Sequence, residues 1–158
     1  MTPAMKLECA GSSIVAEIEI AAPPETVFDA LTTPADLAAW WGAEGAYRTH
    51  DWQIDLRPGG KWQCLATSAG TGTEMTVQGT YLEVDRPHAL AYTWMPGWEK
   101  ELPPTKVRFT LSAAGRGTMV QVEHSGFAGF EQSQQGHLAG WKRVFEWLSA
   151  YCDQKVAK

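Results

Sequence analysis

The sequence has few cysteines, and this shortage excludes two classes of protein. Cys9, Cys64 and Cys152 are odd in number and widely separated, which is unlike a disulfide framework or a zinc cluster. The four histidines show no metal-ligand spacing with them. We therefore expect no metal, no other cofactor and a location in the reducing cytoplasm.

Basic charge and long apolar runs are also scarce. The 158 residues carry a net charge of −5 without a run of Lys or Arg, whereas nucleic-acid binding needs concentrated positive charge. No apolar run approaches the roughly 20 residues that span a membrane, and the opening MTPAMKLECAGSS lacks the apolar core of a signal peptide. We expect neither a nucleic acid nor a membrane as a partner. The length suits one domain, which we place at residues 13–153, between a flexible segment at 1–12 and a tail at 154–158.

Tryptophan, by contrast, is abundant, with eight residues, and an apolar stripe lies near the C-terminus. Within residues 137–152, apolar side chains recur at steps of three and four, namely Leu138, Trp141, Phe145, Leu148 and Cys152. This spacing predicts a helix with one apolar face. Burial of such side chains contributes roughly 1.5–3 kcal/mol for most of them, so the helix needs a large apolar partner.

The preceding chain supplies that partner as a sheet. Alternating apolar residues predict strands at 14–20, 51–56, 62–66, 75–81, 90–94, 106–111 and 120–124. After the first strand, Pro24 begins one short helix and Thr33 caps a second that contains Trp40 and Trp41. Short turns between strands favour an antiparallel meander. We expect an α+β fold with about six or seven strands and a long C-terminal helix on one face.

Five segments in order carry a family resemblance: AAPPETVFDALTTPADLAAWWG, DLRPGGKW, GTYLEVDRPHALAYTW, GTMVQVEHSGF and HLAGWKRVFEWL. Together they resemble the homologues of the activator of the ninety-kilodalton heat-shock-protein ATPase, across about residues 13–153. That family belongs to the START-like, helix-grip (SRPBCC) superfamily, which includes polyketide cyclases. The resemblance implies a curved antiparallel sheet around the C-terminal helix and a pocket for a small, mostly apolar molecule. The resemblance implies no catalytic residue. The sequence departs from the family pattern at Gly42-Ala43, where Gly-Pro is common.

A pocket between sheet and helix would be lined by residues on inward strand faces, on the helix and in the connections. The candidates are Trp41, Trp62, Met75, Trp94, Val122, His124, Phe127, Phe130 and Trp141. Aromatic walls with a few polar groups are typical of small-molecule sites, although most buried aromatic residues serve packing alone. We expect Trp41 and Phe130 to contact a ligand before Trp62 does, because both lie in connections.

His124 is the strongest single candidate for chemistry. It follows Val120 and Val122 at strand spacing, so it should point inward. An inward histidine can act as acid or base near neutral pH, with Tyr81 or Tyr92 as helper. The alternative is a buried structural histidine bonded to a backbone carbonyl.

Gly136 and Gly140 lie inside the predicted helix, where each costs up to about 1 kcal/mol relative to alanine. They share one side with Trp147 and Tyr151. Either a neighbouring loop packs there, or an exposed aromatic strip meets a second subunit and forms a homodimer.

Three functions follow from these observations. The first is a non-enzymatic protein that encloses an apolar or aromatic small molecule. The second is an enzyme of cyclase, aromatase or hydrolase type that uses His124 in the same cavity. The third, suggested by the family alone, is a chaperone-associated protein.

Overall fold

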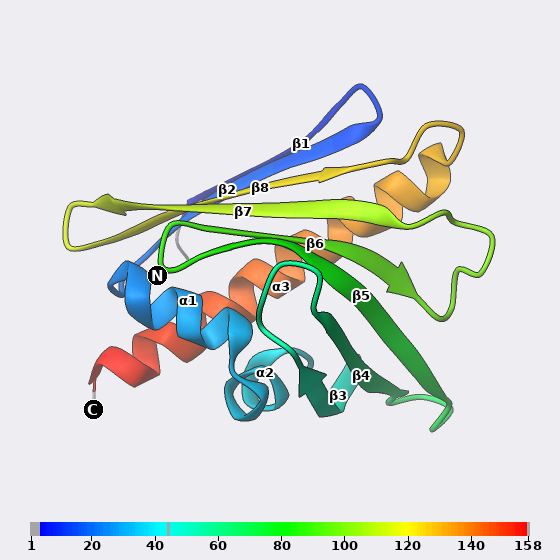
Figure 1. The fold of residues 1–158 in the computed structure, drawn as a ribbon, viewed down its shortest axis with the longest axis horizontal. Coiled ribbons are helices and arrows are strands. Elements are labelled where there is room, and N and C mark those ends of the chain that lie inside the picture. The colour runs from blue at the N-terminus through cyan, green and yellow to red at the C-terminus, as the bar shows by residue number, and fades with distance from the viewer. Residues whose placement is uncertain (1–3, 44, 158) are drawn as a thin grey trace.

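The chain folds into one antiparallel sheet that curls around a long C-terminal helix (Figure 1). The computed structural model describes residues 4–43 and 45–157. Its strands are β1 (Met5–Ala10), β2 (Ser13–Ile20), β3 (Tyr47–Ile54), β4 (Lys61–Ser68), β5 (Glu74–Asp85), β6 (Ala89–Pro96), β7 (Thr105–Ala114) and β8 (Gly117–Ser125). Its helices are α1 (Pro24–Thr32), α2 (Pro34–Trp40) and α3 (Glu131–Ala157).

The sheet has eight strands in the order β1-β2-β8-β7-β6-β5-β4-β3. Strands β3 to β8 form the expected meander, and β2 joins β8 at its far side. The α+β prediction is confirmed, but the count of six or seven strands is wrong. The extra strand is β1, which lies in the segment expected to be flexible and pairs with β2, Leu7 opposite Ala16. Its signal was the short alternation of Met5, Leu7 and Cys9 with charged residues.

The two short helices form where the prolines predicted them. Pro24 and Glu25 occupy the first turn of α1, and Pro34 begins α2. The expected side-chain cap from Thr33 is absent, because its hydroxyl makes no capping hydrogen bond. Its backbone N–H instead donates to the Asp29 carbonyl oxygen at 2.9 Å and closes α1. Thr33 therefore links the helices through its backbone.

Helix α3 begins six residues earlier than the apolar stripe predicted and extends beyond it. Phe145, Leu148 and Cys152 are fully buried in the core, Trp141 is nearly so, and Leu138 is half-buried. The last turns of α3 lie beside α1 (Figure 1). Its first half borders a cavity that residues of β6 and β8 also line. The stripe therefore packs tightly at one end and borders a cavity at the other.

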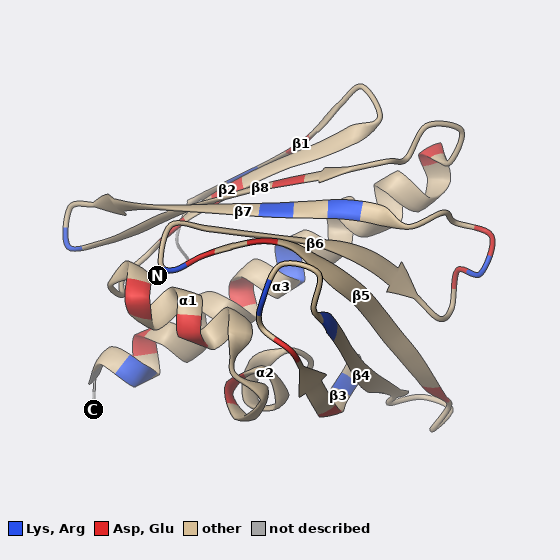
Figure 2. Cartoon of the chain, in the orientation of Figure 1, with Lys and Arg blue, Asp and Glu red and all other residues tan. Residues whose placement is uncertain are grey.

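Charged residues are distributed over several elements. Figure 2 shows Lys and Arg interleaved with Asp and Glu along the strands, the turns and α3. In the described part of the chain, no helix is both long and apolar enough to cross a membrane.

Candidate functional site

A cavity of about 210 Å³ lies under the first half of α3. Four of its twelve lining residues are tryptophans: Trp41 after α2, Trp94 on β6, Trp98 in the β6–β7 loop and Trp141 on α3. Its polar groups are Tyr47, Glu99, His124, His137 and Arg143, and its remaining lining comes from Gly136, Gly140 and Val144. Aromatic walls with a few polar groups are the usual composition of a small-molecule site.

The structure brings four of the nine predicted residues together around this cavity, Trp41, Trp94, His124 and Trp141. Trp62 lies behind Trp94 with stacked rings 5.9 Å apart, and Val122 is buried in the core. Phe127 is buried against His124 at 4.8 Å between ring centroids. The remaining two, Met75 and Phe130, are half-buried and line none of the described cavities.

Four tryptophans form a closed ring beside the cavity. The centroid distances are 6.1 Å from Trp41 to Trp52, 5.9 Å from Trp52 to Trp62, 5.9 Å from Trp62 to Trp94 and 6.0 Å from Trp94 back to Trp41. Such tilted and stacked pairs are favourable beyond the area they bury. Because Trp41 and Trp94 also line the cavity, this tryptophan ring forms part of its wall.

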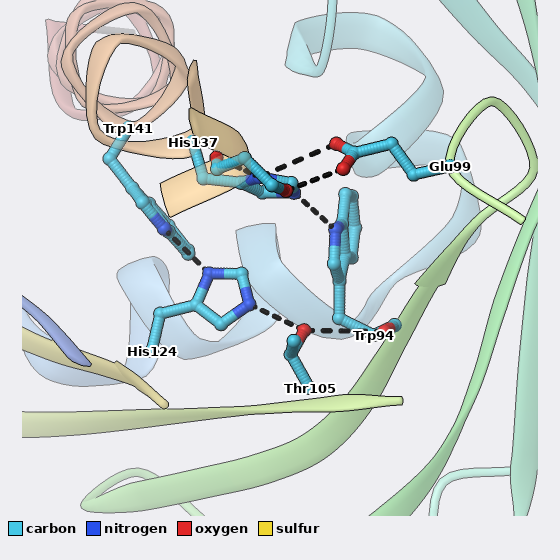
Figure 3. A network of polar contacts seen from close by, with 7 residues as sticks. Trp94, Glu99, Thr105, His124, His137 and Trp141 are labelled. Atoms are coloured by element: carbon cyan, nitrogen blue, oxygen red, sulfur yellow. Dashed lines mark hydrogen bonds and ion pairs between the residues drawn. The ribbon is translucent and has the colours of Figure 1, made fainter. Parts of the chain in front are cut away.

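His124 makes two hydrogen bonds in a series of three (Figure 3). The Trp141 Nε1–H donates to His124 Nδ1 at 3.0 Å. Since an indole nitrogen can only donate, His124 carries its proton on Nε2. Nε2 then donates to Thr105 Oγ1 at 2.7 Å, and the Thr105 hydroxyl donates to the Trp94 carbonyl oxygen at 3.3 Å. The expected backbone carbonyl is therefore reached only through Thr105.

This arrangement keeps His124 neutral. The residue is 1% exposed, and burial, with a smaller contribution from His137, lowers its pKa to about 3. A second proton on Nδ1 would face the Trp141 N–H. Both nitrogens are thus occupied by the protein, which leaves no free lone pair or proton for acid–base chemistry on a bound molecule.

His137 belongs to a second set of polar contacts, and its ring lies beside that of His124 (Figure 3). Its Nε2 accepts the Trp94 indole N–H at 3.1 Å, and its Nδ1 donates to the Ser133 carbonyl oxygen at 2.9 Å. The Ser133 hydroxyl in turn donates to the Glu99 carboxylate. Sequence reasoning missed this set, because nothing in the sequence places the 97–104 loop against the start of α3.

The two helix glycines face the cavity. A Cβ added to Gly136 or Gly140 would meet no atom within 4 Å, so neither a neighbouring loop nor another element requires their small size. Trp147 and Tyr151 do not form an exposed strip, since Trp147 packs edge-on against Tyr47 at 5.7 Å and Tyr151 hydrogen-bonds Asp36. A homodimer remains a prediction, without this strip as its surface.

Tyr81 and Tyr92, the suggested helpers, lie outside this cavity. Both are buried and pack edge-on at 6.2 Å beside a separate space of about 20 Å³ behind the tryptophan ring. Burial raises the pKa of both hydroxyls, so they stay protonated. They are placed to pack rather than to assist His124.

A wider groove of about 910 Å³ lies between β1, β2 and the last turns of α3. It is open and its lining includes Lys6, Glu17, Arg116, Glu146 and Asp153. This groove contains none of the predicted site residues and lacks aromatic walls, so the smaller cavity is the better candidate. Within residues 4–43 and 45–157, no three His, Cys, Asp or Glu side chains are grouped to hold a metal ion.

A curved antiparallel sheet around a C-terminal helix, with two short helices after the second strand, defines a helix-grip protein of the START-like class. The model of the family described as Activator of Hsp90 ATPase homolog 1-like protein matches residues 21–153. The chain belongs to this family.

Solved structures share the fold at low sequence identity. A Nitrosomonas europaea protein is 22% identical with a TM-score of 0.78, over 96% of this chain and 100% of that one. A Mesorhizobium loti protein is 26% identical with a TM-score of 0.72, over 90% of this chain and 97% of that one. An Aeromonas hydrophila AHSA1-like protein, known from a solution structure, is 22% identical with a TM-score of 0.76, over 92% of this chain and 95% of that one. No curated protein matches the chain.

Proposed function

We propose that this protein binds a small apolar or aromatic molecule in the cavity beneath α3. The observation that carries the proposal is the pair Gly136 and Gly140. Each glycine costs a helix interior up to about 1 kcal/mol relative to alanine, yet a Cβ at either position would meet nothing. Gly136 is exposed, so part of the space beside it is open to solvent, whereas Gly140 is half-buried at the cavity, where the missing side chain leaves room for a ligand.

The volume of the cavity limits the size of the ligand. A cavity of roughly 150 Å³ is enough for benzene, and typical ligand pockets measure about 300–1,000 Å³. At about 210 Å³, this one suits a single aromatic ring with a short substituent. A lipid chain or a polyketide would require the cavity to expand.

Binding without turnover is favoured over an enzyme that uses His124. Both nitrogens of that side chain are hydrogen-bonded to Trp141 and Thr105, and no described serine or cysteine lines the cavity to act as a nucleophile. A chaperone-associated role is motivated only by the description of the family, and a pull-down with the chaperone tests it.

The proposal is tested by thermal shift and tryptophan fluorescence with benzene, ethylbenzene and indole. A ligand at one hundred times its Kd stabilises the folded state by roughly 2.7 kcal/mol, which raises the Tm of a domain of this size by about 5 °C or more. We expect at least one of these probes to raise the Tm by this amount and to change the fluorescence of the cavity tryptophans.

Two variants decide whether the effect arises in the cavity. Gly140→Leu places a side chain in the open space and should abolish the shift. Ala139→Leu adds the same side chain at the neighbouring exposed position of α3 and should leave the shift intact. The proposal fails if no probe stabilises the protein, or if the two variants respond alike.

A further inference from the structure

The two ends of the cavity differ in their unused hydrogen-bonding groups. His137 and Arg143 both line it from α3 and are about 9 Å apart along the helix axis, at 1.5 Å per residue. At the His137 end, both imidazole nitrogens are engaged, and the Glu99 carboxylate accepts the Ser133 hydroxyl proton. At this end of the cavity, the protein itself supplies the hydrogen-bond partners of these polar groups.

At the Arg143 end, two donors have no acceptor among the described residues, although Arg143 is itself exposed to solvent. The Tyr47 hydroxyl oxygen accepts the Trp41 indole N–H at 3.0 Å, and no described residue accepts the proton of that hydroxyl. No described carboxylate lies within 4.0 Å of the Arg143 guanidinium. Both side chains line the same cavity. This end therefore offers one neutral and one charged donor to a ligand.

The electrostatics of Tyr47 fit this role as a donor. Burial raises the pKa of the Tyr47 hydroxyl, and the Trp41 hydrogen bond and the Arg143 charge offset that effect only in part. The group is thus protonated at neutral pH and close enough to Arg143 to feel its charge. An acceptor placed between the two would satisfy both.

We propose that the ligand is a small aromatic carboxylate, with its ring among the cavity tryptophans and its carboxylate accepting from Tyr47 and Arg143. This inference rests on the proposed function and narrows it. Charge-assisted hydrogen bonds from a guanidinium to a carboxylate are about twice as strong as neutral ones. One ring and one carboxylate also match a cavity slightly larger than benzene needs.

Calorimetric titration with three probes tests the inference: benzoate, its neutral isostere benzamide and the apolar ethylbenzene. We expect benzoate to bind at least about tenfold more tightly than benzamide, because a hydrogen bond to a charged group contributes enough for that ratio. The variants Tyr47→Phe and Arg143→Gln should each weaken benzoate binding about tenfold and leave ethylbenzene binding unchanged. Lys142→Gln, an exposed neighbour on α3 outside the cavity, is the matched control and should change neither.

The outcomes separate this inference from the proposed function. If ethylbenzene binds, but benzoate binds no better than benzamide or is indifferent to both variants, the carboxylate assignment is wrong and the proposed function stands. If Lys142→Gln weakens benzoate as much as Arg143→Gln does, the effect is general surface charge, and the assignment is again overturned. If no probe binds, both fail.

Discussion

His124 and His137 meet at right angles under α3, with ring centroids 5.3 Å apart, and they hold opposite tautomers. His124 accepts a tryptophan N–H on Nδ1 and donates from Nε2, whereas His137 accepts one on Nε2 and donates from Nδ1. The donors are Trp141 and Trp94, two walls of the cavity. The histidines therefore fix the orientation of the indole rings that a ligand would contact.

The first prediction concerns acid stability. His124 has a pKa of about 3 in the folded protein against 6.5 as its ordinary value, so between these pH values the unfolded chain binds a proton that the folded chain does not. Its contribution to stability is complete above pH 6.5 and declines as the pH falls toward 3, by up to about 1.4 kcal/mol per unit. Urea unfolding from pH 7 to 4 measures this slope.

The control is His124→Gln, whose amide can accept from Trp141 and donate to Thr105 without titrating. We expect the variant to have a shallower dependence on pH than the parent protein. Equal slopes would show that His124 is protonated in the folded state.

The second prediction concerns the indole N–H of Trp141. Trp141→Phe removes the donor to His124 Nδ1 and leaves a buried acceptor unpaired, which costs about 1–3 kcal/mol. Urea unfolding should show this loss. Trp147→Phe, a half-buried position on the same helix without a described hydrogen bond from its indole, should cost less. Equal losses would assign the effect to ring size.

The third prediction separates stability from binding. Gly136→Ala and Gly140→Ala should each raise the free energy of unfolding by up to about 1 kcal/mol, because alanine favours the helix and its methyl group meets no atom. The same variants should weaken binding of an aromatic probe, since they occupy cavity volume. Thermal unfolding with and without ethylbenzene measures both effects, and unchanged binding would count against the site.

The fourth prediction concerns thiol reactivity. Burial raises the pKa of Cys64 and Cys152 to about 12, so neither forms a reactive thiolate in the folded protein. Cys9 is exposed on β1. A thiol reagent at pH 8 should therefore modify a single thiol in the folded protein and all three after denaturation. Fast reaction of Cys64 or Cys152 without denaturant would show that the core opens readily.

The fifth prediction concerns the turn before β3. Gly42 has φ +122°, and an added Cβ would overlap the Tyr47 carbonyl oxygen and lie 3.1 Å from the Arg48 Cα. Gly45 has φ +84° but open space around it. Gly45→Ala should cost roughly 1–2 kcal/mol for its backbone conformation alone, and Gly42→Ala should cost more. Chemical denaturation compares the two, and similar losses would exclude the clash.

Periodicity in the sequence predicted the parts of the fold that depend on one buried face. The stripe from Trp141 to Cys152 and the alternation along β7 and β8 required only spacing. The register near Leu82 was not predictable, because a bulge between Tyr81 and Glu83 shifts the pairing of β5 with β6. A bulge depends on the partner strand, which alternation within one strand does not reveal.

The candidate site was predicted in part for a similar reason. Inward strand positions predicted Trp94 and His124, and helical spacing predicted Trp141, and all three line this cavity. Trp98 and Glu99 belong to a loop, and Tyr47 lies in a strand whose start was predicted four residues late. Their convergence depends on how loops cross the end of the sheet, which local patterns do not encode.

The tryptophan ring also determines how this protein responds to light. Indoles about 6 Å apart are close enough to exchange excitation energy, so we expect the four members to share it. A guest that quenches Trp41 or Trp94 would dim the other two as well, although Trp52 and Trp62 do not line the cavity. If the cavity takes a guest, the fluorescence of all four rings would report its occupancy.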